Sequence, residues 1–146
     1  MLLVESTIRY RLTRSDLSRQ RALRRILRCD LNSRRLFGEE SSQDERRQEP
    51  RLDLRLPINL RPARMQGLTI YTDPDAPPFL ALTSNISLGG LGVVHDEPIG
   101  MPTFLAEFDV AEDEPLILVV EQRWTTEIDA YSYRSGGRIL GIARRP

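Results

Sequence analysis

The chain has no lysine, only one cysteine and one histidine, and no long apolar run. All 21 basic side chains are arginine, an imbalance from which no function follows. A single cysteine, Cys29, excludes an internal disulfide framework and fits a reducing compartment. No apolar stretch approaches the ~20 residues of a membrane-spanning helix, and Glu5 interrupts the opening where a signal peptide would continue its apolar core. These absences predict a cytoplasmic protein with no transmembrane segment.

Few residues are candidates for catalysis. The one histidine, His95, stands beside Asp96, but the sequence around it offers no nucleophile and no ligands with metal spacing. We therefore predict a loop histidine, no catalytic residue, no metal site, no resident cofactor and no enzymatic activity.

The charges are divided unevenly along the chain, although they sum to zero. Residues 1–37 contain 10 arginines against three acids, and residues 38–146 contain 11 arginines against 18 acids. The pattern predicts a basic N-terminal arm of about +7 joined to an acidic body of about −7.

The arm contains the signals of one amphipathic helix. Residues 2–12 alternate and fit either a short strand or an extended arm, after which Ser15 is a good N-cap and Gly38 a stop. We predict a helix from about 16 to 36, with an apolar stripe and an arginine-rich opposite face. The stripe consists of Leu23, Ile26, Leu27 and Leu31. It favours docking to a protein partner or self-association over binding of nucleic acid or an anionic membrane.

The rest of the chain has the pattern of a β-protein. Residues 38–50 have almost no apolar side chain and predict a polar linker. From residue 51 the apolar period is two, and short apolar runs separated by Gly and Pro favour an antiparallel barrel or sandwich. The division is an arm at 1–37, a linker at 38–50 and a β-domain at 51–146. The later runs are 65–71, 79–84, 91–94, 103–110, 116–124, 126–133 and 138–143, with Gly136-Gly137 separating the last two.

Two short motifs offer ligand-binding chemistry. Arg47 and Arg51 are four residues apart in an extended segment, so their side chains tend to point to the same side. The planar guanidinium group of each can bind either a phosphate or the edge of a guanine base. Asn85 and Ser87 share a face at a strand end and can offer an amide and a hydroxyl to a base. After them, a glycine pair removes side-chain bulk and permits positive φ, so that a flat ligand can approach the backbone; the pair is Gly89 and Gly90.

In this order, R-x-x-x-R and N-x-S-x-x-G resemble the PilZ domain, a family of bacterial receptors for cyclic di-GMP. The resemblance covers residues 46–143, including RLDLRLPINL, NISLGGLGV and the closing RILGIA. It implies a six-stranded antiparallel PilZ-type β-barrel, here preceded by the amphipathic helix.

The resemblance also implies a non-enzymatic receptor in second-messenger signalling. Its arginine linker would fold over cyclic di-GMP, and a protein partner would detect the change. Arg47 and Arg51 would contact guanine and phosphate, Asn85 and Ser87 a guanine edge, and Gly90 would keep the turn open. Arg46 and Gly89 are further candidates.

Two alternatives remain open. One is a PilZ-like interaction module that has lost nucleotide binding, and the other is a nucleic-acid-binding adaptor that uses the basic arm. The remaining aromatic side chains in 124–133 are predicted to be core residues or cross-strand pairs; they are Trp124, Tyr131 and Tyr133.

Overall fold

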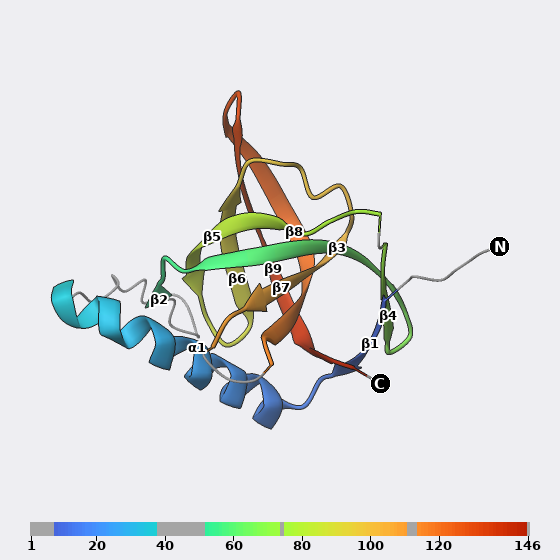
Figure 1. Ribbon diagram of the computed structural model, residues 1–146, viewed down its shortest axis with the longest axis horizontal. Coiled ribbons are helices and arrows are strands. Elements are labelled where there is room, and N and C mark those ends of the chain that lie inside the picture. The colour runs from blue at the N-terminus through green and yellow to red at the C-terminus, as the bar shows by residue number, and fades with distance from the viewer. Residues whose placement is uncertain (1–7, 38–51, 74, 111–113, 146) are drawn as a thin grey trace.

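A computed structural model describes residues 8–37, 52–73, 75–110 and 114–145, and for Ile8 and residues 30–37 it describes the backbone alone. These residues form one helix and nine strands (Figure 1). In chain order they are β1 (Ile8–Thr13), α1 (Asp16–Phe37), β2 (Leu52–Asp53), β3 (Pro57–Gln66), β4 (Thr69–Thr72), β5 (Phe79–Ile86), β6 (Gly90–His95), β7 (Thr103–Phe108), β8 (Leu116–Asp129) and β9 (Ser132–Arg144). The prediction of a mainly β protein with an N-terminal helix is confirmed.

All strand pairs are antiparallel, and six strands close into a ring in the order β3, β7, β8, β9, β6, β5. The remaining three strands extend this sheet. β4 continues from β3 in a hairpin, β1 pairs with both β4 and β9, and the short β2 lies beside β5. The prediction of antiparallel strands is correct, but the sheet has nine strands where six were expected.

The ring has a core inside it and a second core against part of its outer surface. The inner cluster includes Phe104 and Phe108 of β7, and the outer cluster includes Leu105 from the same strand. Successive residues of a strand point to opposite faces, so β7 and the first half of β8 are buried on both sides. Burial on both sides explains why LILVV at 116–120 reads as a continuous apolar run instead of an alternating one.

Two predicted segment boundaries are wrong. The apolar run 65–71 is not one strand, because it turns at Gly67, which has a φ of 60°, between β3 and β4. Gly136 and Gly137 do not separate two strands but lie inside β9, while the chain reverses at Ala130 and Tyr131. The resulting β8–β9 hairpin projects from the ring on the side away from α1 (Figure 1).

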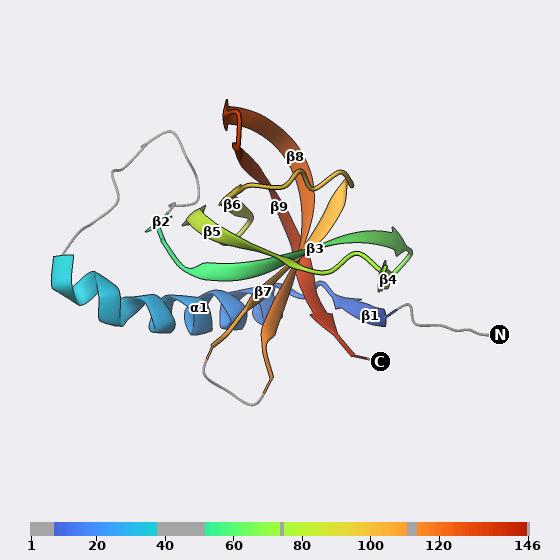
Figure 2. The same ribbon diagram turned by 45° about the horizontal axis from the view of Figure 1, so that its top comes forward.

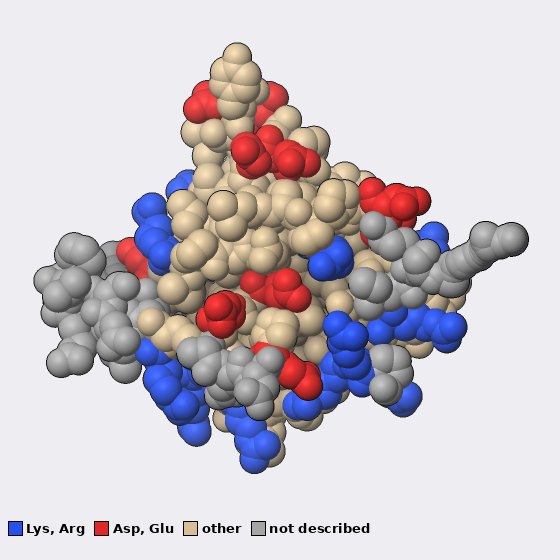
Figure 3. Space-filling view, in the orientation of Figure 1, with Lys and Arg blue, Asp and Glu red and all other residues tan. Residues whose placement is uncertain are grey.

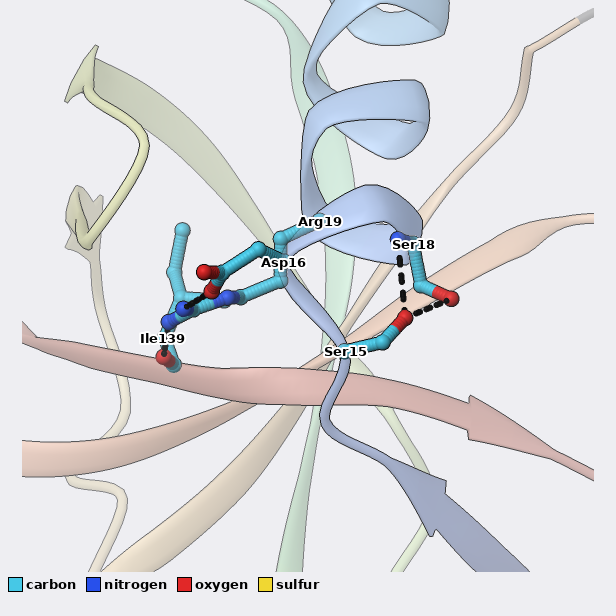
Figure 4. Close-up of polar contacts among 5 residues, drawn as sticks. All are labelled: Ser15, Asp16, Ser18, Arg19 and Ile139. Carbon is cyan, nitrogen blue, oxygen red and sulfur yellow. Dashed lines mark hydrogen bonds and ion pairs between the residues drawn. The ribbon is translucent and has the colours of Figure 1, made fainter.

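The helix begins where the sequence predicts. Ser15 caps it, since the backbone N–H of Ser18 donates to Ser15 Oγ at 3.1 Å (Figure 4). Arg19 pairs with Asp16 and donates through Nη1 to the backbone oxygen of Ile139 in β9, at 3.4 Å. The side chain of Arg19 therefore attaches the first turn to the ring.

The described part of the apolar stripe, three of its four residues, packs against the ring. Ala22 and Ile26 are buried in the inner cluster, and Leu23 and Leu27 are partly buried against it. Figure 2 shows α1 running beneath the strands. Leu31 lies among the residues whose side chains are not described.

Replacing Ile26 by alanine should reveal how strongly the helix is docked. The side chain is fully buried, so the substitution removes apolar contacts and leaves a cavity, at a cost of about 2–5 kcal/mol in the free energy of unfolding. Leu17→Ala on the same helix is the control, because that side chain is 56% exposed and should change the free energy by less than about 0.5 kcal/mol. Urea denaturation measures both, and equal effects would contradict this docking.

Candidate ligand-binding site

The N-x-S-x-x-G motif forms the end of β5, a tight turn and the start of β6. The N–H of Ser87 donates to the oxygen of Gly90 at 2.9 Å, and the N–H of Gly90 donates to Ser87 Oγ at 3.0 Å. The serine hydroxyl therefore closes the turn as an acceptor and keeps its own O–H as a donor.

The sequence suggested that the glycines of this turn allow a positive φ, but the turn does not use them in that way. The positive values among the described glycines are at Gly67, Gly100 and Gly141. At Gly90 the constraint is space, since a Cβ there would lie 3.3 Å from the backbone oxygen of Gly137. The close approach of β9 to this turn explains the glycine.

A β-bulge turns the side chain of Asn85 to the outside of the ring. The register between β5 and β6 shifts between Thr83 and Asn85, and Thr83 is fully buried. Both Ser84 and Asn85 lie over Gly92: a Cβ at Gly92 would be 2.7 Å from Ser84 Oγ and 3.1 Å from Asn85 Oδ1. Gly92 thus leaves room for an amide and a hydroxyl directly above the sheet.

Asn85 belongs to a row of directly paired residues that crosses five strands. From β2 to β8, each member is the register partner of the next. The row consists of Asp53, Asn85, Gly92, Gly136 and Trp124. At a strand spacing of about 4.8 Å, Asn85 and Trp124 are about 14 Å apart along the row. Between them lie two buried glycines, and the side chains of Ser84, Asn85 and Trp124 lie over these glycines.

The indole of Trp124 covers Gly136 at the end of this row. A Cβ at Gly136 would lie 2.5 Å from Cζ2 of the indole, so the ring rests against the bare backbone of β9. The side chain is 45% exposed, so of the two predicted roles, core residue or cross-strand pair, Trp124 has the second, with Gly136 as its partner. Tyr131, at the turn, is 81% exposed and has neither role. Tyr133 does form the predicted cross-strand contact, with its ring stacked on His95 at 5.7 Å between centroids.

The short strand β2, which follows the linker, lies beside the motif. β2 pairs Leu52 with Ile86 and Asp53 with Asn85, and the fully buried Thr83 secures the segment that follows. Thr83 Oγ1 donates to the oxygen of Leu54 at 2.7 Å and accepts from the N–H of Leu56 at 2.9 Å.

The predicted site residues of the linker cannot be placed. Arg46, Arg47 and Arg51 lie outside the described residues. Of the other predicted residues, the structure brings together Asn85, Ser87, Gly89 and Gly90. Trp124 joins them on the same sheet surface. The signal for it in the sequence is Gly136, because a glycine inside a strand indicates that another group approaches the backbone closely.

Beneath this surface lies a buried polar cluster around His95. His95 is 4% exposed at the end of β6, so the prediction of a loop histidine is wrong. Nδ1 lies 2.6 Å from the backbone oxygen of Glu97, which only accepts, so Nδ1 carries the proton. Nε2 then accepts from Ser135 Oγ at 2.7 Å, and Thr125 Oγ1 is 2.9 Å from the same hydroxyl. Burial lowers the pKa of His95.

Exposed arginines cover the outer side of α1. The described members of the arginine face include Arg21, Arg24 and Arg28, all exposed, and Figure 3 shows basic side chains along the edge where α1 and β1 lie. No group of three His, Cys, Asp or Glu among the described residues is placed to hold a metal ion. In the same part of the chain, no helix has the length and apolar character that crossing a bilayer requires.

No protein-family profile, curated protein sequence or solved structure matches this chain.

The buried His95 should make stability depend on pH. The unfolded chain takes up a proton near pH 6.5, whereas the folded protein, with its lowered pKa, does so only at lower pH. The free energy of unfolding is thus highest above about pH 6.5 and decreases as the pH falls through that value. Urea titrations between about pH 8 and pH 5 test this, with His95→Gln as the variant that flattens the upper part of the curve. An unchanged curve in the variant would assign the pH dependence to other groups.

Proposed function

We propose that this chain is a PilZ-type receptor for cyclic di-GMP in the bacterial cytoplasm, that its six-strand ring is the β-barrel of that family, and that it signals by binding without catalysis. The observation that carries the proposal is the cross-strand row from Asp53 to Trp124. It joins the end of the linker, the N-x-S-x-x-G motif and an exposed aromatic ring on one surface.

The chemistry of this surface suits a purine base. The exposed indole of Trp124 offers a stacking partner, and base–aromatic stacking contributes about 1–3 kcal/mol. The amide of Asn85 supplies one donor and one acceptor direction for a base edge. Guanine also presents N–H donors, and the carboxylate of Asp53, in register beside Asn85, is an anionic acceptor for them.

The linker arginines would close over the ligand from the β2 side. Arg51 is bonded directly to Leu52, and Leu52 pairs with Ile86, so the linker enters the sheet beside the motif turn. The forked guanidinium groups of Arg47 and Arg51 would bind phosphate and guanine there.

A change at the turn has a route to α1. The N–H of Ile139 donates to the oxygen of Gly89 at 2.8 Å, and the oxygen of Ile139 accepts from Arg19 at 3.4 Å. The helix and the turn also lie on either side of a shallow depression, lined by Leu23 and Ser87 among others. Ligand binding at the turn would therefore alter the position of α1, whose exposed arginine side a protein partner would recognise.

Isothermal titration calorimetry with cyclic di-GMP tests the receptor. We expect micromolar or tighter binding by the wild type, no binding by Arg47→Ala/Arg51→Ala, and no heat with GTP as control ligand. Arg64→Ala is a matched control, because Arg64 lies over Tyr71 in the β3–β4 hairpin and should not affect affinity. Absence of binding by folded wild-type protein would instead support a PilZ-like module without nucleotide binding.

Gly136→Ala should disturb the site without unfolding the protein. The added methyl group would meet the indole of Trp124, which is half exposed and can move away, so stacking should weaken and the emission of the chain's one tryptophan should shift. Gly67→Ala is the control, since it strains a turn with a φ of 60° but meets no atom within 4 Å. Fluorescence spectra and titrations compare the two variants; unchanged emission and affinity in Gly136→Ala would contradict this role of Trp124.

A further inference from the structure

Two arginines flank the glycine on which Trp124 rests. Arg134, Gly136 and Arg138 alternate along β9, so their positions face outward together, whereas Ser135 between them is fully buried. The Cα atoms of the two arginines are about 13 Å apart at a strand rise of about 3.3 Å per residue. Two side chains of this length can reach toward each other over the residue between them.

Both arginines are exposed and uncompensated. In the part of the chain that the structure describes, neither Arg134 nor Arg138 forms a hydrogen bond or an ion pair. The register partner of Arg138 on β8 is Glu121, but that carboxylate is held by Arg123, with Nη2 and Nε both 3.1 Å from Oε1. Two positive charges thus border the half-exposed indole of Trp124, and no carboxylate of the described residues is paired with either of them.

The indole of Trp124 lies over Gly136, between the positions of the two arginines, since a Cβ at Gly136 would be 2.5 Å from its Cζ2. An anionic group held by both arginines would therefore lie beside this half-exposed ring and not on the strand backbone. The guanidinium fork matches phosphate oxygens in a bidentate manner.

We propose that Arg134 and Arg138 are a second phosphate-binding pair, which holds a phosphodiester of the nucleotide beside the indole of Trp124 while a base stacks on that ring. This inference rests on the proposed function and deepens it. It assigns phosphate contacts to the sheet itself, in addition to the linker. The ligand class is a nucleotide and not a free anion, because the two cations border the same row as the indole and Asn85.

The test compares substitutions that keep or remove the charge. Calorimetry with cyclic di-GMP is carried out on Arg134→Gln, Arg138→Gln and the double variant, with circular dichroism to verify folding. We expect each single substitution to weaken binding about tenfold and the double to weaken it about a hundredfold. Lysine at either position should restore part of the affinity, because it keeps the charge but loses the fork. Arg64→Gln is the matched control and should bind like the wild type.

The outcomes separate this inference from the receptor proposal. If Arg47→Ala/Arg51→Ala abolishes binding but the Arg134→Gln/Arg138→Gln variant retains wild-type affinity, the receptor stands and the second arginine pair is refuted. If the lysine variants bind no better than the glutamine variants, a charge role is refuted as well. A wild type that binds no cyclic di-GMP overturns both proposals.

Discussion

The pairing of β3 with β5 closes the ring, and the other features depend on it. Once Pro57–Leu60 is bonded to Phe79–Leu82, every ring strand has an inner and an outer face. The inner face is filled by the larger apolar cluster, and β1 and β4 bring a second cluster against the outer face of β3, β7 and the first half of β8. The outer face of β5, β6 and the middle of β9 lies outside this second cluster, and it is the face that carries the motif, the glycines and the indole.

Local signals predicted the helix well because its determinants lie within the helix. Ser15 caps it, and the 3.6-residue period of Leu23, Ile26 and Leu27 matches the side that packs against the ring. The prediction that Gly136 and Gly137 separate two strands was wrong, because the atoms that require glycine at these positions lie on another strand. A Cβ at Gly137 would be 2.0 Å from the backbone oxygen of Glu121, a restriction that composition alone does not show.

The candidate site was also predicted in part, and again the part that was predicted depends on residues close together in the sequence. Asn85, Ser87 and Gly90 act within a few residues of one another, and they were expected together and lie together. For Trp124 the sequence left two roles open, core residue or cross-strand pair, and the structure has the second, with Gly136 as the partner. β8 has an extra residue between Gln122 and Trp124, and such a bulge reverses which face the next side chain occupies, so the indole lies on the outer surface.

The hydrogen bonds of Thr83 have a consequence for binding thermodynamics. They fix the chain at Leu54 and Leu56, and the packing of Ile26 fixes α1, so the intervening segment is tethered on both sides. Closing a tethered loop costs conformational entropy once, on folding, and not again for each ligand. In the proposed receptor, this tether would supply Arg47 and Arg51 to the sheet surface at an effective concentration on the order of millimolar. Loosening Thr83 would then weaken the proposed ligand complex without altering any atom that touches the ligand.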